Sequence, residues 1–575
     1  MSSTTSTSNV GIGSLSTSGG STKLSGTLFG IDVNTLIDSL TEAKSVPNTL
    51  RQDKIDTNTK KISAYSDLRT KLTALQTAST ALRNPRVTSG DSDAFEAKQT
   101  LSRESGSIAA SSLYGVSAQN GAANGTYSVT INRVAKADTI SGTQAITASS
   151  ATPVTTAGNL VLEGTNIALT SSMTLTQIKD AINNVSSTTK VTASIVQAGT
   201  NDYRLLLKGS QTGNAISISD DQTGSILTDL GLAASGATDT SLSAEIVLDG
   251  VTVTRTSNSV NDLITGVSME LYQADAGKPI TLTISDNLSG VSDAVTSFIT
   301  AYNDIVDYVQ KQRQTDTKGT IGEDQLLYND GLMLSVYRGL QSTVSTGASG
   351  VTTGALKSLG DIGIDLTQDG KLEVSDDTKF EDALLSNLDQ VKALFGFSAN
   401  ESSGIQVVDR PDKIPAALSG KTITVRVTAT DASGLPTAAE FEVDGVVTAA
   451  RIENGFVKGV KGTDFENFAV GYSGGVVSGT PFTGTFKPTQ GIADQIAGVL
   501  EPVLNQTDGS LKNATDTLTT TNTRLEDQIS TLKTQLDLYR ARLTLQFQAA
   551  QEAISALESQ KSSIKSFTDS LNGNG

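Results

Sequence analysis

Apolar residues recur every three, four or seven positions in a long polar stretch near the N-terminal end of the chain. Within residues 28–83 they are Ile31, Val33, Leu36, Ile37, Leu40, Ile62, Tyr65, Leu68, Leu72, Leu75 and Leu82. This spacing predicts helices with a single narrow apolar edge. Pro47 is expected to interrupt or restart the first helix, because proline has no N–H to donate.

A second helical pattern follows Gly491 and continues almost to the end of the chain. One row falls at intervals of seven, and it contains Ile529, Leu536, Leu543, Ala550, Leu557, Ile564 and Leu571. Leu518, Leu525, Leu532 and Tyr539 form a companion row. Two rows at alternating spacings of three and four predict a coiled-coil seam. Tyr65 and Tyr539 lie on these rows, so we expect both to pack in cores.

The two apolar edges need partners, and two arrangements are open. Residues 525–571 could pack along residues 28–83, antiparallel or side by side, with the rest of the chain looped out between them. Alternatively, each helix could pair with the same helix of another subunit. Both stretches have one narrow apolar edge on a long polar helix, and this similarity favours pairing within the chain. The residues predicted to mediate helix pairing or a partner contact are Leu36, Leu40, Leu68, Leu72, Leu75, Leu525, Ile529, Leu532, Leu536 and Leu543.

Between these helical stretches the period of the pattern changes to two. Residues 126–135, 203–210, 244–255 and 280–285 alternate as β-strands do, with Asp249-Gly250 as a strong hairpin signal. Residues 175–185 predict a short helix. Helical character returns at 291–312 and continues with interruptions to 397, and residues 404–490 contain further strands such as 421–430 and 440–452. The fold class is therefore α+β and multidomain, with long terminal helices and inserted antiparallel β domains.

These patterns divide the chain into four parts. Residues 1–25 hold 14 Ser or Thr and 4 Gly, and are expected to be a disordered tail. Residues 26–112, 289–398 and 491–575 are expected to form one discontinuous helical leg and bundle domain. Residues 113–288 form a β-rich head of one or two nested domains, and 399–490 form an additional β module.

Composition and charge exclude several functions. The 575 residues contain no Cys, His or Trp, which removes disulfides, thiolate nucleophiles, imidazole bases and the common zinc sites. A net charge of −17 argues against nucleic acid or an anionic membrane as a partner. No run of about 18 apolar residues could span a bilayer. The N-terminus has no signal-peptide pattern, so the protein is expected to remain inside or to leave without a cleaved signal.

Two acidic motifs resemble functional sites. Residues 365–376 place Asp365, Asp369, Gly370 and Asp376 at positions one, five, six and twelve of a calcium loop, but Thr367 occupies position three and the last ligand is not Glu. A hairpin around Asp369-Gly370 is the favoured interpretation. The adjacent carboxylates at 220–221 and 376–377 could serve acid–base chemistry, but solvated loop positions fit them better. With no nucleotide-binding loop either, we expect no enzyme activity, cofactor or metal.

Four separated blocks resemble the bacterial flagellar filament cap family, also called hook-associated protein 2. They are GTLFGIDVNTLIDSLTEAKSVPNTLRQDKI (26–55); AFEAKQTLS, GTYSVTINRVAKADTISG and LTQIKDAINN to YRLLLKGSQTGN (94–214); VTSFITAYNDIVDYV to VKALFGF (295–397); and RARLTLQFQAAQEAISALESQKSSI (540–564). The block at 356–397 distinguishes this family from flagellin and hook–filament junction proteins. The β module at 399–490 departs from the family's pattern, in which many members pass almost directly to the last helix.

The resemblance implies a structural assembly protein at the extracellular tip of the flagellum. It implies a ring-shaped homo-oligomer, a pentamer, whose terminal helices contact flagellin and whose β domains form a plate under which exported flagellin inserts. A type III export chaperone is a further implied partner, and export requires no cleaved signal peptide. The ten edge residues named above would then serve helix pairing or flagellin contact. A filament-associated adhesin that binds surfaces or glycans through its β modules, or another axial protein, is the alternative function.

Overall fold

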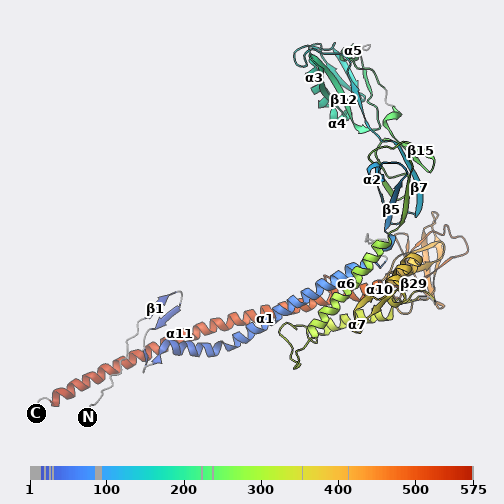
Figure 1. Ribbon diagram of the computed structural model, residues 1–575. Coiled ribbons are helices and arrows are strands. Elements are labelled where there is room, and N and C mark those ends of the chain that lie inside the picture. The colour runs from blue at the N-terminus through green and yellow to red at the C-terminus, as the bar shows by residue number, and fades with distance from the viewer. Residues whose placement is uncertain are drawn as a thin grey trace. The chain divides into compact units, whose positions relative to one another are not determined.

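The structure is a computed structural model of the whole chain. It describes residues 15–18, 21–24, 27–28, 31–83, 93–221, 225–235, 239–351, 354–411 and 413–572. The chain divides into two compact units, one made of residues 1–91 and 295–575 and the other of residues 92–294. Long helices and several antiparallel sheets are present in the same chain (Figure 1), which confirms the predicted α+β multidomain class.

The first unit is built on two long helices from opposite ends of the chain. Helix α1 spans Val33–Thr80 and α11 spans Ser510–Asn572. The two helices lie side by side over part of their length (Figure 1). Asp32 caps the start of α1 by accepting a hydrogen bond from the backbone N–H of Asn34 at 2.8 Å.

Pro47 does not interrupt α1, so the predicted break is wrong. The helix continues through it to Thr80. A proline inside a helix removes one backbone hydrogen bond and is costly. The neighbouring side chain of Asn48 donates to the backbone oxygen of Ile529 on α11 at 3.3 Å, so contact with the second helix supports α1 at this point.

Shorter helices complete the bundle around the second half of α1. They are α6 (Leu288–Arg313), α7 (Gly331–Thr346), α8 (Asp377–Ser386), α9 (Leu388–Phe395) and α10 (Ile492–Leu504). Gly491 joins the preceding strand to α10. A Cβ atom there would lie 2.3 Å from the carbonyl carbon of Phe395, so only glycine permits this close passage of two backbones.

Within the stretch 1–25, predicted to be disordered, the structure describes residues 15–18 and 21–24. They form strands β1 (Leu15–Ser18) and β2 (Ser21–Leu24), which pair antiparallel with Leu15 opposite Leu24. Cross-strand backbone bonds thus order these polar residues. The remainder of that stretch lies outside the described residues. Two further short strands, β3 (Thr27–Leu28) and β4 (Ile31–Asp32), precede α1.

Residues 397–490 of the first unit form what we call the continuous β domain. Two antiparallel sheets, in the orders β21-β29-β23-β24-β25 and β22-β28-β27-β26, enclose a core rich in Phe and Val. The strands are β21 (Phe397–Glu401), β22 (Ile405–Asp409), β23 (Ile423–Thr430), β24 (Pro436–Val443), β25 (Val446–Ala449), β26 (Arg451–Glu453), β27 (Phe456–Lys458), β28 (Ala469–Tyr472) and β29 (Phe482–Gln490).

The second unit contains a β domain that we call the split β domain, made of residues 93–135 and 239–288. Its sheets have the orders β15-β14-β7-β18-β5 and β16-β17-β6. Its strands are β5 (Lys98–Glu104), β6 (Tyr114–Ala118), β7 (Gly125–Arg133), β14 (Ala244–Leu248), β15 (Val251–Arg255), β16 (Ser259–Val260), β17 (Val267–Leu271) and β18 (Ile280–Asp286). Short helical turns η1 (Ala94–Glu96) and α2 (Ala110–Leu113) also belong to it.

A third β domain, which we call the nested domain, is inserted between β7 and β14 at residues 137–235. It has a core of its own, in which α3 (Leu175–Asn184) packs on β11. Its other elements are β8 (Ala137–Ser141), β9 (Gly158–Leu162), β10 (Thr165–Leu169), α4 (Ser186–Thr189), β11 (Val191–Gly199), β12 (Asp202–Thr212), β13 (Ile218–Asp220) and α5 (Ser225–Leu230). Thr174 and Gln177 form a capping box at the start of α3, the helix predicted at 175–185.

One segment lies in a different part of the fold from the division given above. The sequence-based division assigns residues 93–112 to the helical domain, but they belong to the split β domain, where residues 98–104 form β5 and pair with β18 along its whole length. The residues around Leu101 are almost all polar and carry only a weak helix or strand signal, so the pairing partner decides the structure.

Candidate functional site: the paired terminal helices

Helices α1 and α11 pair antiparallel within the chain. The carboxylate of Asp38 pairs with Arg540, the side chain of Arg51 donates to Gln528 at 3.2 Å, and Asn58 donates to Asn522 at 2.8 Å. As the residue number increases along α1, the number of its partner on α11 decreases. The structure therefore has the pairing within the chain that the similar apolar edges of the two stretches favour.

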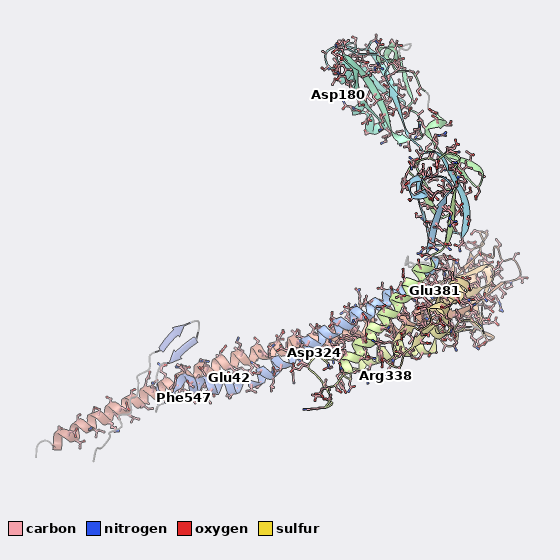
Figure 2. All side chains as sticks on the ribbon, in the orientation of Figure 1. Glu42, Asp180, Asp324, Arg338, Glu381 and Phe547 are labelled. Carbon is pink, nitrogen blue, oxygen red and sulfur yellow. The ribbon has the colours of Figure 1, made fainter. Side chains whose placement is uncertain are left out.

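The N-terminal end of this pair is joined by an apolar cluster. Val33 and Ile37 of α1 are buried and pack against Leu543 and Phe547 of α11. Figure 2 shows Phe547 on α11 close to the first turns of α1. The Lys44 ammonium also lies 4.8 Å from the ring centroid of Tyr539, so that half-buried ring packs in the seam as expected.

The middle of the pair is joined by amide side chains beside a buried isoleucine, Ile55. Asn522 is buried, accepts a hydrogen bond from Asn58, and directs its own amide toward the hydroxyl of Thr59 at 3.4 Å. A buried asparagine in a helical seam specifies the register at a cost in stability, because other registers leave its amide without partners. The seam is therefore specific in alignment and modest in strength.

Three of the predicted site residues lie in the bundle core instead of this seam. Leu68, Leu72 and Leu75 are fully buried in the second half of α1, where that helix contacts α10. Their side chains therefore stabilise the bundle in this conformation and present no surface to another molecule.

The other predicted residues lie along the α1–α11 pair. Leu536 is buried, Leu40 is 38% exposed, and the remainder are partly buried, namely Leu36, Leu525, Ile529, Leu532 and Leu543. Whether any of these side chains also contacts a partner stays a prediction.

A second set of apolar residues on the same helices was not singled out from the sequence. Leu538 and Leu545 on α11 are 68% and 67% exposed, and Val46 and Leu50 on α1 are also exposed. Each pair lies on the side of its helix away from the seam, as the helical period requires. The sequence does contain a signal for Leu538 and Leu545: they are large apolar residues in a helix, but they are not members of the rows that form the seam.

The last turns of α11 extend beyond the start of α1. Leu557, Ile564 and Phe567, which include two members of the seven-residue row, are largely exposed there. The row thus continues past the point at which its partner helix begins. Over the described residues, no helix is both long enough and apolar enough to cross a membrane.

Tyr65 packs in the bundle as expected and also ties α1 to α7. Its hydroxyl donates to the carboxylate of Asp330 at 2.6 Å, and Asp330 caps the start of α7 and lies 3.1 Å from the Lys61 ammonium. Burial and the Asp330 carboxylate raise the pKa of Tyr65. Burial disfavours the charged form of Asp330, but hydrogen bonds from Tyr65, the Met333 N–H and Lys61 outweigh it and lower the pKa of that carboxyl.

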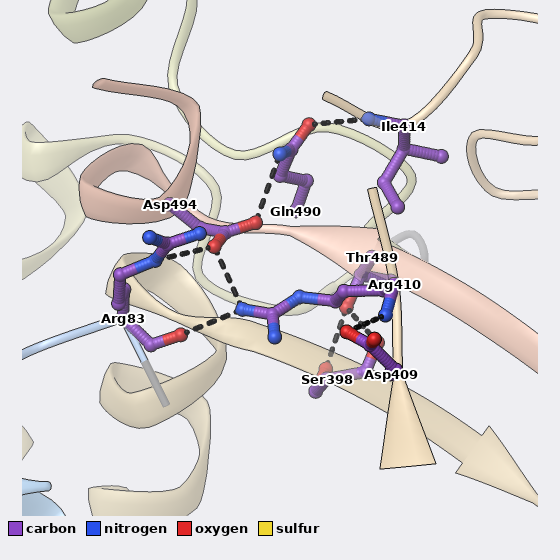
Figure 3. Close-up of polar contacts among 8 residues, drawn as sticks. All are labelled: Arg83, Ser398, Asp409, Arg410, Ile414, Thr489, Gln490 and Asp494. Atoms are coloured by element: carbon purple, nitrogen blue, oxygen red, sulfur yellow. Dashed lines mark hydrogen bonds and ion pairs between the residues drawn. The ribbon is translucent and has the colours of Figure 1, made fainter. Parts of the chain in front are cut away.

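A buried ionic cluster joins the bundle to the continuous β domain (Figure 3). The Asp494 carboxylate on α10 accepts from Arg83 at 3.0 Å, from Arg410 at 2.7 Å and from Gln490 at 2.8 Å. Arg410 also donates to the backbone oxygen of Arg83 at 3.2 Å. Nothing in the sequence pattern indicates this cluster, because Arg83, Arg410 and Asp494 are far apart in sequence and meet only in the fold.

The acidic motifs take the favoured structural roles. Strands β19 (Ile364–Leu366) and β20 (Leu372–Val374) form the hairpin, Asp365 accepts from the Ser375 hydroxyl at 2.7 Å, and Asp376 caps α8. Asp221 accepts instead from the backbone and side chain of Asn159. Throughout the described part of the chain, no group of three or more metal-ligating side chains comes together.

Comparisons with known proteins agree on one family. A family model described as the C-terminus of flagellar hook-associated protein 2 matches residues 241–559, and the N-terminal model of the same family matches residues 29–138. The B-type flagellar hook-associated protein 2 of Pseudomonas aeruginosa is 30% identical over 368 residues, covering 59% of this chain and 73% of that protein.

Two further proteins illustrate the likeness. Flagellar hook-associated protein 2 of Escherichia coli K12 is 28% identical over 385 residues, which is 64% of this chain and 78% of that protein. The crystal structure of the D1-D2-D3 domains of the flagellar cap protein FliD from Escherichia coli matches 79% of this chain and 99% of its own, at 23% identity and a TM-score of 0.48. On the strength of the two family models and the Pseudomonas relative, this chain belongs to the flagellar hook-associated protein 2 family.

Proposed function

We propose that this protein is a structural assembly protein that caps the distal, extracellular end of the bacterial flagellar filament and promotes the insertion of exported flagellin subunits. Membership of the hook-associated protein 2 family supports the cap over an adhesin or another axial protein. The cap is a homo-oligomer in the form of a ring, and we propose a pentamer. A type III export chaperone binds the chain before export, which proceeds without cleavage of a signal peptide.

The observation that carries the proposal is the set of exposed apolar side chains on the paired terminal helices. Val46, Leu50, Leu538 and Leu545 lie outside the seam and are exposed although they are large and apolar. Large apolar side chains exposed close together mark contact sites for other proteins. Flagellin at the filament tip is the partner we assign to these side chains.

Replacing Leu538 and Leu545 together with Gln tests this assignment. Both side chains are largely exposed, so we expect the free energy of unfolding to change by less than about 0.5 kcal/mol. In cells that carry only this variant we expect flagellin to be lost to the medium and filaments to be short. Leu385→Gln is the matched control, since Leu385 is 70% exposed on α8 of the bundle and away from these helices. Normal filaments with the double variant would contradict the assignment.

The oligomer and the export route need separate measurements. Light scattering of the purified full chain should give the mass of five subunits, and another integral multiple would replace the pentamer. Mass spectrometry of the exported protein should find its N-terminal sequence uncleaved. Removal of residues from that end during export would contradict the proposed route.

A further inference from the structure

We infer that the continuous β domain is a second copy of the split β domain, produced by internal duplication and fixed to the helical bundle. This inference is independent of the proposed function. It accounts for the origin of residues 399–490, which the sequence predicts to be an additional β module.

The order of strands in the sheets is the first observation. When strands are numbered within each domain along the chain, and the hairpin β26–β27 is counted as one strand, the larger sheet has the order 5-4-3-8-1 in both domains and the smaller sheet has the order 6-7-2. The strand content differs at one place: the continuous domain has the hairpin β26–β27 where the split domain has the single strand β16. All the pairings are antiparallel. Many other orders would satisfy the rules of short connections, so their coincidence needs a cause.

The same hairpin marks the same place in both sheets. Residues 244–251 read AEIVLDGV and residues 439–446 read AEFEVDGV. The Asp-Gly pair has positive φ at both positions in each copy, 48° and 85° at 249–250 and 48° and 80° at 444–445. This conformation is the type I′ turn that joins two strands tightly.

Register extends the match from this turn across all five strands. In the split domain Leu248 lies opposite Val129, Val129 opposite Ile280, and Ile280 opposite Glu104. In the continuous domain Val443 lies opposite Ile423, Ile423 opposite Phe486, and Phe486 opposite Glu401. Both ladders keep apolar residues at the same steps and end on a glutamate in the first strand.

An ion pair and a turn repeat as well. Arg133 lies 3.3 Å from Glu245 in the split domain, and Arg426 lies 3.0 Å from Glu440 in the continuous domain, between the same two strands. The smaller sheets share a tight turn. In the split domain Gly266 has positive φ, and the N–H of the next residue, Val267, donates to the backbone oxygen of Ile264 at 3.0 Å. In the continuous domain Asn467 has positive φ, and the N–H of Phe468 donates to the backbone oxygen of Phe465 at 3.0 Å.

The connection at the C-terminal end of the domains also agrees. The last strand leads within two residues into a helix, since β18 ends at Asp286 before α6 and β29 ends at Gln490 before α10. The copies differ between the third and fourth strands. There the split domain contains the nested domain, whereas the continuous domain has a short turn at 431–435 organised by the Asp431 carboxylate, which accepts from the N–H groups of Ser433 and Leu435 at 2.9 Å.

The buried cluster at Asp494 fixes the second copy in place. The side chain of Arg410 is 3% exposed and that of Asp494 is 0% exposed, and the Arg410 guanidinium lies 4.2 Å from the ring centroid of Phe397. The Phe397 N–H donates to the backbone oxygen of Arg83 at 3.0 Å, next to the end of α1. Breaking such a buried pair leaves a charge without compensation, so the domain is a fixed second β domain and no loosely attached appendage.

An exchange of connections in the full chain tests the duplication. Residues 132–243 are replaced by RVTATDASGLPTA, the sequence of residues 426–438, which the registers place between the same flanking positions, Ile131 and Ala244. We expect β7, β14 and β18 to keep their protection from hydrogen exchange. The matched control omits one residue of the insert, which turns alternate side chains to the wrong face. We expect it to lose that protection.

The first exchange removes the nested domain, and the split domain could need it in order to fold. The reciprocal exchange avoids this problem because it keeps the nested domain. Here residues 132–243 replace residues 426–438, and we expect β23, β24 and β29 to stay protected. Protection retained in either exchanged chain supports the duplication. Loss of protection at the exchanged site in both chains overturns it.

Arg410→Met tests the fixation. We expect amides at 81–83, 397 and 490–494 to exchange at least roughly ten-fold faster, while amides in the middle of β23 keep their rates. Arg426→Met is the control, because Arg426 pairs with Glu440 and Glu442 on the domain's own surface. It should leave the junction unchanged. Unchanged exchange at the junction in Arg410→Met would overturn the fixation.

Discussion

The two halves of α1 meet their neighbours through different chemistry. Between Ala64 and Leu75 the helix buries its leucines completely against the bundle, whereas between Asn48 and Thr59 it buries a single isoleucine, Ile55, and meets α11 through amide groups. Apolar burial stabilises by about 25 cal/mol per Å², while a net hydrogen bond contributes only ~1 kcal/mol. One half is therefore built for stability and the other for alignment, although both present the same narrow stripe in the sequence.

The largest effect should come from Leu72→Ala in the buried half. Leu72 is fully buried, so removal of its side chain should lower the free energy of unfolding of the bundle by about 2–5 kcal/mol. Urea titration followed by circular dichroism measures this loss. Leu40→Ala on the same helix is the control and should cost less than about 1 kcal/mol, since Leu40 is already 38% exposed. Equal losses would abolish the distinction between the halves.

High pH should weaken the buried half next. The Tyr308 hydroxyl of α6 donates to the backbone oxygen of Ala64 at 2.6 Å, and burial, with a contribution from Asp67, raises the pKa of Tyr308 to about 12. Below pH 10 the tyrosine is protonated in both states. Between pH 10 and 12 the unfolded chain loses the proton first, so stability should fall by about 2–3 kcal/mol.

Tyr308→Phe is the variant that isolates this effect. It should reduce the loss of stability between pH 10 and 12, measured by urea titrations at stepped pH. An unchanged pH dependence in the variant would show that other groups cause the loss.

Ile37→Ala should act locally at the far end of the helix pair. Ile37 is buried among Val33, Leu543 and Phe547, which form a small cluster. We expect a loss of about 1–2 kcal/mol, at or below the low end for such substitutions, confined to the amides of the first turns of α1 and to 540–550 of α11. Hydrogen exchange measures it, and Leu50→Ala provides an exposed control. Faster exchange throughout the bundle would show that the two halves are coupled.

The smallest effect on stability and the clearest on alignment should come from Asn522→Leu. Leucine removes the amide pair with Asn58 and fills the seam with apolar atoms, so stability should change by less than about 1 kcal/mol. Alignment can be measured by disulfide formation, because the chain contains no native cysteine. Cysteines at 51 and 528 should cross-link in the parent, and cysteines at 51 and 532 should gain yield only in the variant. A parent-like yield at both pairs would remove Asn522 as the determinant of register.

Many of the helices and hairpins can be predicted from patterns of neighbouring residues. The rest of the fold depends on contacts between segments that are distant in sequence. The seven-residue row from Ile529 and the Asp249-Gly250 turn predicted a paired helix and a hairpin, because each signal is contained in a few neighbouring residues. The direction of the helix pair did not follow, since a row of leucines fits either direction. It is set by contacts such as Asn58 with Asn522.

The candidate site was only partly predictable for the same reason. Leu68, Leu72 and Leu75 carry the same periodic signal as Leu36 and Leu40, but only the arrival of α10 distinguishes a core position from a surface one. The exposed Leu538 and Leu545 were passed over because they lie off the rows. Arg410 and Asp494 meet across the fold, and no spacing in the sequence brings them together.

The unequal lengths of α1 and α11 have a mechanical consequence. At 1.5 Å per residue the 63 residues of α11 extend about 95 Å, and only the part up to about Phe547 is doubled by α1. Two bonded rods resist bending more than one, so flexural rigidity drops where α1 begins. A sideways load on the C-terminal end should therefore bend α11 just beyond Phe547, and the doubled shaft behind that point would transmit the load to the bundle as a lever does.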